Sequence, residues 1–448
     1  MPAWVIAIWD SVRSGIWFVP TVALIAAVTA AVVMPRVDQT IAVADVRGFS
    51  WIETSAESAR STLVSISSAL ITMASVVFSV AMVTLSLTTS QFGSRLLRTF
   101  LDSNATQVTL GVFLGASAYC LLVLQSITTK EDQTFVPHFS VGLAVASTVL
   151  AMGVFVYFMH HVATSIQAQS VVRAVADDLN DAIDVVFPER IGDHPEPDHN
   201  APANLPDFTA EDAIAVESHA EGYLQAIDGD ALLEAARAHD VVLRLAYQPG
   251  QFVVHSTPLA HVAPVGNCDE ELAEKVRSSF ITGIRRTPRQ DVECAIDELV
   301  EVAVRALSPG INDPFTAVAC IDYLGAALRR LATRSTPQPM RYDSDGALRV
   351  VATPITFADA MESAFVPIRE YGRDSTIVHA RLLQSLEIVA NEVQNPDAAG
   401  CVREHAEMVL RSARKNLPEQ NDVARIEDYH DRVVRVIESG SQEPRPAE

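Results

Sequence analysis

The sequence predicts an α-helical membrane protein with four transmembrane helices, followed by a cytosolic α+β domain made of a small β-rich module and a helical bundle. Two observations predict this fold class. Four apolar runs, residues 16–34, 63–87, 108–127 and 139–160, are each long enough to cross about 30 Å of hydrocarbon. After the fourth run the chain becomes polar and acidic, and all 448 residues together carry a formal net charge of −22. We therefore assign residues 1–164 to a transmembrane domain and the remainder to a soluble part.

The charge distribution excludes several classes of protein. None of the four predicted spans carries Asp, Glu, Lys or Arg in its central portion. Intramembrane ionisable groups mark proton relays, coupling sites and voltage sensors, so a proton-coupled transporter or a voltage-gated device is disfavoured. The acidic balance argues against nucleic acid as a partner, because phosphate binding needs clustered Lys and Arg. The expected partner is the lipid bilayer.

The cysteines of the soluble part indicate its compartment. Cys268, Cys294, Cys320 and Cys401 lack the close paired spacings of a disulfide framework or a zinc site. Lys and Arg are balanced between the two sides of the spans, so the positive-inside rule alone does not set the orientation. Because reduced cytosolic thiols are the simpler assumption, we expect both termini in the cytoplasm and the acidic loop containing Asp38 outside.

A stripe of small hydroxyl side chains follows the second predicted span. Its members are mostly three or four residues apart, which places them on one face of a helix: Ser65, Ser68, Thr72, Ser75, Ser79 and Ser86. Such a stripe allows close packing and hydrogen bonding between helices, or it lines an aqueous path. Both interpretations remain open from the sequence.

The turn after this span carries Arg95 and Arg98 in an amphipathic segment. If the hydroxyl stripe lines a path, these two arginines stand near its inner mouth and would concentrate anions there. The simpler interpretation is that they anchor the cytoplasmic end of the span.

The soluble part divides by composition into four segments. Residues 165–187 predict a helical extension of the last span, and residues 188–212, which are rich in Pro, Asp, Asn and His, predict a linker. Residues 213–264 predict a small β-rich module with one short helix, in which Asp228 and Asp230 supply the cap. Residues 265–448 predict a helical domain, with helices over 269–279, 288–307, 314–332, 357–371, 376–394, 397–416 and 420–438.

Two polar clusters of the soluble part are candidates for a ligand or anion site. Arg285 and Arg286 precede Asp291, whereas Asn312 and Asp313 stand at the start of a helix, where anions are favoured. The structural alternative is that Asp291 pairs with an arginine and that Asp313 caps its helix ahead of a proline. No sequence signature of a catalytic triad, phosphate loop or metal-binding helix is present. We therefore expect no catalytic residue, no metal site, no cofactor and no enzymatic activity.

Four segments resemble the bacterial family of predicted membrane proteins catalogued as domain of unknown function 2254: residues 61–98, 222–228, 285–291 and 306–317. The resemblance extends from the first span to about Leu331. It implies a multi-pass protein of the bacterial inner (cytoplasmic) membrane. The name of that family assigns no function, so no catalytic or ligand residue is carried over from it.

Two functions are consistent with these patterns. The first is an oligomeric ion channel or pore, lined by the second span and regulated by the cytosolic domain through ions or a small-molecule ligand. Several copies are needed, because four helices enclose little space. The second is a non-conducting, membrane-anchored scaffold or ligand sensor, in which the hydroxyl stripe packs spans together.

Overall fold

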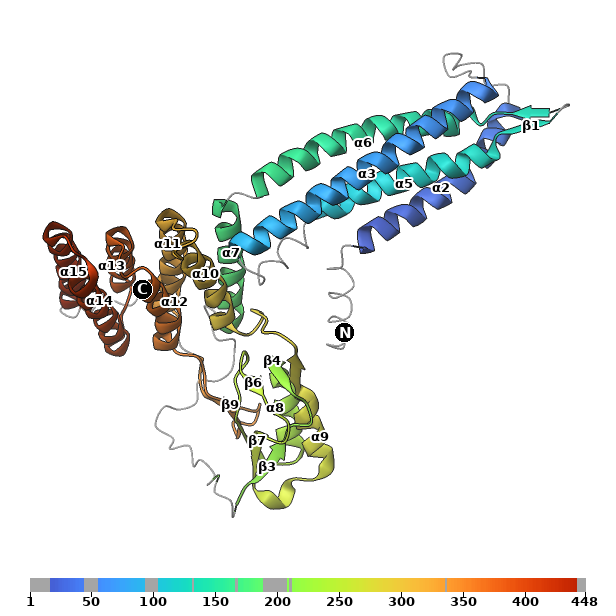
Figure 1. Cartoon of the computed structure of the whole chain (residues 1–448). Coiled ribbons are helices and arrows are strands. Elements are labelled where there is room, and N and C mark those ends of the chain that lie inside the picture. The colour runs from blue at the N-terminus through green and yellow to red at the C-terminus, as the bar shows by residue number, and fades with distance from the viewer. Residues whose placement is uncertain are drawn as a thin grey trace. The chain divides into compact units, whose positions relative to one another are not determined.

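The computed structural model describes residues 17–43, 55–92, 104–130, 133–165, 168–187, 208, 212–334 and 337–440. The chain forms two compact units, Met1–Val171 and Val172–Glu448, and each is described by itself. Figure 1 shows the long helices of the first unit in blue to green, and the sheets and helices of the second in green to red.

The first unit is built from four long helices: α2 (Phe18–Val43), α3 (Ala56–Phe92), α5 (Asn104–Ser126) and α6 (His138–Ser165). Among the described residues these are the four helices that are long and apolar enough to cross a membrane, and they coincide with the four predicted spans. A short hairpin, β1 (Thr128–Lys130) with β2 (Gln133–Phe135), joins α5 to α6.

Helix α5 is the centre of this bundle. It packs against α2, α3 and α6, and 56% of its most apolar window is buried, against 11% for α2 and 22% for each of α3 and α6. The core residues Phe113, Cys120 and Val123 of α5 meet Leu63 and Val77 of α3. The outer helices therefore keep broad apolar surfaces that no helix of the described bundle covers, as expected for surfaces that face lipid or another chain.

The position of Asp38 differs from the prediction. The sequence predicts a loop at this residue, but Asp38 lies within α2, which continues to Val43. Its carboxylate is 5% exposed and accepts hydrogen bonds from the backbone N–H groups of Phe139 (2.8 Å) and Ser140 (3.0 Å) and from the hydroxyl of Ser140 (2.5 Å). Asp38 thus caps the N-terminus of α6 from another helix and satisfies two backbone donors there.

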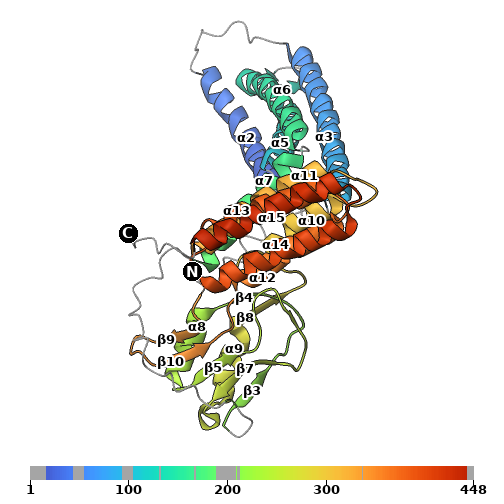
Figure 2. The same cartoon turned by 90° about the vertical axis from the view of Figure 1, so that its left-hand side faces the viewer.

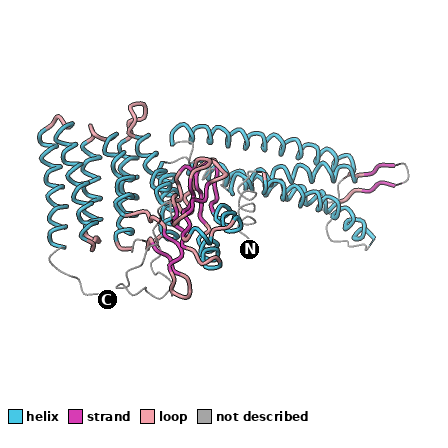
Figure 3. The backbone as a smooth tube through the Cα atoms, turned by 90° about the horizontal axis from the view of Figure 1, so that it is seen from below, coloured by secondary structure: helices cyan, strands magenta, loops and turns pink. Residues whose placement is uncertain are grey.

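The second unit contains two small sheets. Figure 3 shows their strands in magenta, close together. The larger has the strand order β3 (Ile214–Glu217), β7 (Pro258–Ala263), β5 (Val242–Leu245), β10 (Leu348–Val351) and β9 (Met340–Tyr342). The smaller has the order β6 (Phe252–Val253), β4 (Gly222–Ile227) and β8 (Phe280–Gly283). Helices α8 (Gly229–Ala238) and α9 (Glu270–Ser279) share the core of these strands, and Asp228 caps α8 as expected.

The larger sheet extends beyond the segment in which the sequence predicts strands. β9 and β10 lie between two helices of the predicted helical domain, and β10 pairs in parallel with β5, about a hundred residues earlier in the chain. Val350 of β10 is buried in the core of the sheet. A short strand whose partner is so distant in sequence has little local pattern by which to be recognised.

Six helices complete the second unit: α10 (Val292–Ala306), α11 (Pro314–Ala332), α12 (Phe357–Tyr371), α13 (Thr376–Ala390), α14 (Pro396–Asn416) and α15 (Gln420–Gly440). They begin within about four residues of the predicted starts. Successive helices pack on one another, and Figure 2 shows α13, α14 and α15 side by side. Helix α7 (Ala168–Val186) is tied to Arg330 of α11 and to Arg334, just after α11, because both arginines bond Asp184. The hydrogen bond from Arg334 lowers the pKa of Asp184.

His379 is a buried histidine of the row formed by helices α10 to α15. Its ring is 1% exposed, with Nδ1 2.9 Å from the carbonyl oxygen of Ser375 and Nε2 3.2 Å from the hydroxyl of Ser412 on α14. Burial lowers the pKa of His379. The neutral ring is therefore the form that folding favours, and the unfolded chain binds a proton more readily, at its ordinary pKa of about 6.5.

We expect the thermal unfolding midpoint of the full-length protein to fall by a few degrees as the pH is lowered from neutral through and below that value. The stabilising contribution is complete above the unfolded pKa and is lost below it. Replacing His379 with Gln should make the profile shallower, with the remaining slope due in part to His405, whose pKa burial also lowers. Replacing the exposed His255 should leave the profile unchanged. An unchanged profile in His379→Gln would contradict this account.

Candidate functional site

The hydroxyl stripe lies on the outward face of α3. Ser65, Ser68, Thr72, Ser75, Ser79 and Ser86 are all exposed, whereas the buried positions of the same helix are Ala59, Leu63, Ser67, Leu70, Ala74, Val77 and Thr84. At about 100° of rotation per residue, the stripe is centred about 170° from the buried face. The described helices of this chain therefore do not cover the stripe.

Two hydroxyls of the stripe bond to carbonyl oxygens of their own helix. The hydroxyl of Thr72 donates to the carbonyl oxygen of Ser68 (2.9 Å), and that of Ser75 donates to the carbonyl oxygen of Ile71 (3.0 Å). Back-bonding of this kind lets Ser and Thr lie on an apolar helix surface without an unpaired donor. Exposed apolar side chains flank the stripe on both sides: Val64, Ile71, Phe78 and Met82 on one, and Val76, Val83 and Leu87 on the other.

Arg95 and Arg98, the predicted inner mouth, lie outside the described residues.

Arg286, one of the candidate anion-site residues, is occupied by acidic neighbours. Its Nε and Nη2 donate to the two carboxylate oxygens of Asp291 (2.7 and 2.8 Å), and its Nη1 donates to Asp297 (2.7 Å). Burial alone would lower the pKa of Arg286, but the hydrogen bonds and charges of Asp291 and Asp297 raise it above its ordinary value. A guanidinium held in this way by two carboxylates has little capacity for an external anion.

Asp291 connects several elements of the second unit. It is 4% exposed, pairs with Arg286, and caps α10 by accepting from the backbone N–H of Cys294 (2.9 Å). The turn at Gly250 packs against its carboxylate so closely that a Cβ at that position would overlap it, and Gly250 has φ +95°, a conformation that glycine adopts without strain. Asp291 therefore pairs with an arginine, which is the structural role that the sequence offered as an alternative to an anion site.

Asn312 and Asp313 have local structural roles. Asn312 adopts a left-handed conformation (φ 51°) between α10 and α11, which asparagine tolerates better than most residues. Asp313 caps α11 by accepting from the N–H groups of Phe315 (3.1 Å) and Thr316 (3.2 Å), and the hydrogen bond from the Thr316 hydroxyl lowers the pKa of Asp313.

The four candidate anion-site residues are not brought together. Arg285 and Arg286 precede α10, while Asn312 and Asp313 follow it, and a helix of 15 residues is about 22 Å long. The side chain of Arg285 is exposed, and its carbonyl oxygen accepts from Gln225 (2.8 Å). Across the described ranges, no three His, Cys, Asp or Glu side chains are grouped to hold a metal ion.

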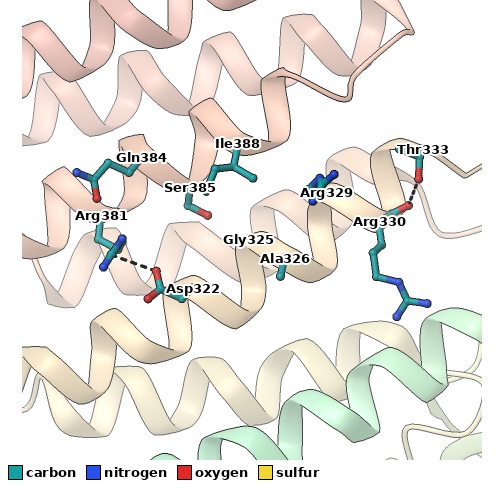
Figure 4. A pocket seen from close by; sticks show the side chains of 10 residues that line it. All are labelled: Asp322, Gly325, Ala326, Arg329, Arg330, Thr333, Arg381, Gln384, Ser385 and Ile388. Carbon is teal, nitrogen blue, oxygen red and sulfur yellow. Dashed lines mark hydrogen bonds and ion pairs between the residues drawn. The ribbon is translucent and has the colours of Figure 1, made fainter.

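A cavity with a volume of about 700 Å³ lies between α11 and α13 (Figure 4). The sequence does not predict this cavity. Arg329 on α11 and Arg381 on α13 contribute to its wall, as do Ala326 and Ile388. The only local sequence signal was the pair Arg329–Arg330 at the end of a predicted helix, which is also the ordinary place for basic residues.

Four long apolar helices followed by a mixed domain of helices and small sheets are consistent with a membrane-associated protein that has a large second domain. The chain belongs to the family described as "Predicted membrane protein (DUF2254)", whose model matches residues 13–388. The family resemblance inferred from the sequence is thereby confirmed.

The chain is similar to uncharacterised proteins of Mycobacterium bovis and Mycobacterium tuberculosis. Each is 28% identical over 448 residues, an alignment that covers 98% of this chain and 84% of the relative. No solved structure gives a significant match.

The pairing of Arg286 with Asp291 yields a stability prediction. Asp291→Ala should lower the free energy of unfolding by about 3–5 kcal/mol, because it leaves a partly buried guanidinium without its main partner and removes a helix cap. Arg286→Lys should destabilise by a smaller amount, since lysine cannot form the two parallel bonds.

The matched control is Arg285→Lys, an exposed neighbour that we expect to change stability by no more than about 0.5 kcal/mol. Denaturant unfolding of the full-length protein in detergent measures all three variants. Equal stability of Arg285→Lys and Asp291→Ala would show that Asp291 does not hold these elements together.

Proposed function

We propose that the protein is an ion channel or pore formed by several copies of the chain, lined by the hydroxyl stripe of α3 and regulated by the second unit. The observation that carries the proposal is the position of the stripe, opposite the face of α3 that packs on α5. Six exposed hydroxyl groups on a helix long and apolar enough to span a membrane are better suited to a wet surface than to lipid.

The composition of α3 supports a pore rather than a transporter. Its six hydroxyl oxygens can replace part of the water shell of an ion, and residues 61–87 of α3 contain no charged side chain that would trap the ion. The apolar residues on both sides of the stripe provide the surface through which neighbouring copies of α3 pack around a common axis.

We place the protein in the bacterial inner membrane with its second unit in the cytoplasm. All five cysteines are free, and Cys294 and Cys320 are buried within helices of the second unit. Unpaired thiols are usual in a reducing compartment.

A scaffold or ligand sensor that does not conduct ions is the second candidate. The cavity between α11 and α13 favours it, because a small-molecule site in the second unit needs no pore. In that case the hydroxyl stripe joins copies of the chain by close helix packing.

Ion flux into liposomes tests the pore. We expect the full-length protein to pass potassium, sodium or chloride, and we expect Ser75→Leu and Ser79→Leu to reduce this flux strongly, because a ring of leucines narrows and dewets the path. Val149→Leu is the control: it enlarges an exposed apolar residue in the same way, but on α6, away from the stripe and its flanks, and should leave flux near that of the wild type.

The mass of the purified complex separates the two candidates further. Normal flux in both serine variants would remove the stripe as the lining. Loss of the oligomer in these variants, from a protein that passes no ion, would support the scaffold or sensor instead.

A further inference from the structure

The cavity between α11 and α13 is a groove where the two helices approach closely in its middle. Gly325 of α11 faces Ser385 of α13, and a side chain at Gly325 would overlap the serine hydroxyl. Both helices run in the same direction here, since Arg381 pairs with Asp322 near one end of the groove and Arg329 with Glu392 near the other. Figure 4 shows Arg381 and Arg329 on opposite sides of the Gly325 contact.

Both arginines keep donors for a ligand. Arg381 directs its Nε to Asp322 (3.1 Å), and Arg329 directs Nε and Nη2 to a single oxygen of Glu392 (3.1 and 2.8 Å). Among the described residues, the remaining terminal nitrogens, Nη1 of Arg329 and both of Arg381, have no partner within hydrogen-bond distance. The two side chains are 55% and 39% exposed, so these donors face solvent.

The acidic partners are weak competitors. Exposed ion pairs contribute only about 0–1 kcal/mol, so a ligand can replace them at little cost. Burial raises the pKa of Asp322, and the charge of Arg381 only partly opposes that effect. The lining contains three arginines and one carboxylate, an unusual balance in a chain of net charge −22.

The third arginine is not available. Arg330 turns away to α7, where its guanidinium bonds Asn180 (2.5 Å) and Asp184 (2.7 Å), and Figure 4 shows it pointing out of the groove. The wall between Arg329 and Arg381 is formed by the exposed residues Ala326 and Ile388 and by Gln384. Its middle is therefore mainly apolar, with one amide.

We propose that this groove binds a small organic molecule that carries an anionic group at each end and an apolar middle, with Arg381 holding one end and Arg329 the other. Arginine recognises carboxylate and phosphate by paired N–H donors, and a cavity of about 700 Å³ is in the range that takes a small organic ligand. This site is separate from the Arg286 cluster and does not depend on whether α3 conducts ions.

The spacing of the helices sets the length of the ligand. Asp322, beside Arg381, is seven residues from Arg329 on α11, which corresponds to about 10 Å. Arg381 lies on α13, and Glu392, the partner of Arg329, follows the end of that helix; the two are eleven residues apart, or about 16 Å at the helical rise. The two anionic groups should therefore be separated by about 10 to 16 Å. Movement of the arginine side chains can reduce this separation, but a ligand with adjacent anionic groups would still be too short.

Calorimetric titration of the full-length protein in detergent with straight-chain dicarboxylates tests this directly. At low ionic strength we expect decanedioate to bind about tenfold or more tightly than butanedioate, which is too short to reach both arginines. Decanoate, which has one carboxylate on a chain of the same length, separates two-ended recognition from simple apolar binding and should bind as weakly as butanedioate.

Three variants locate the site. Arg329→Gln and Arg381→Gln should each weaken decanedioate binding about tenfold, the equivalent of about 1.4 kcal/mol. Ala326→Phe should block it by filling the middle of the groove without removing a charge. Arg414→Gln is the control, since Arg414 is as exposed as Arg329 and is also paired with a glutamate, Glu427, but lies outside the groove.

Unfolding midpoints close to that of the wild type would show that these variants fold. The proposal is overturned if decanedioate does not bind at millimolar concentration, if decanoate or butanedioate binds as tightly, or if both arginine variants bind it as the wild type does. Ion-flux measurements take no part in these outcomes, so failure of the pore proposal leaves them unaffected.

Discussion

The second unit depends on one buried carboxylate, that of Asp291. A charge removed from water must be paired and hydrogen-bonded, and Asp291 meets both requirements with Arg286 and the N-terminus of α10. Arg286 follows the strand β8, which pairs with β4, and the turn at Gly250 closes over the same carboxylate. Satisfying one charge thereby fixes the smaller sheet, a turn and the first helix of the helical row against one another.

Local rules explain why so much of the helical fold was predictable. Asp269, Asp313 and Asn395 each cap the helix that follows, proline stands at the first position of α11 and α14, and apolar residues recur at helical spacing. These signals lie within a few residues of the element they define. The four long apolar helices were equally visible, because length and hydropathy are also local properties.

Features that depend on distant partners were not predictable in the same way. The strands β9 and β10 complete a sheet whose other strands lie about a hundred residues earlier, and Asp38 caps a helix that begins a hundred residues later. The candidate site shows the same division. The six hydroxyls of α3 share one face because helical spacing is local. Arg329 and Arg381 line the two ends of one groove only after two helices have packed, with Gly325 permitting the close approach.

If α3 lines a pore as proposed, its back-bonded hydroxyls have a consequence for ion selectivity. Thr72 and Ser75 give their hydrogens to carbonyl oxygens of their own helix, so their oxygens present lone pairs outward rather than O–H donors. Lone pairs attract cations and repel anions, and a pore lined in this way would prefer potassium or sodium to chloride. Arginines at the mouth of such a pore would have the opposite effect and favour chloride. Selectivity for cations would therefore indicate that the hydroxyls line the narrowest part of the pore, and selectivity for anions would indicate the arginines.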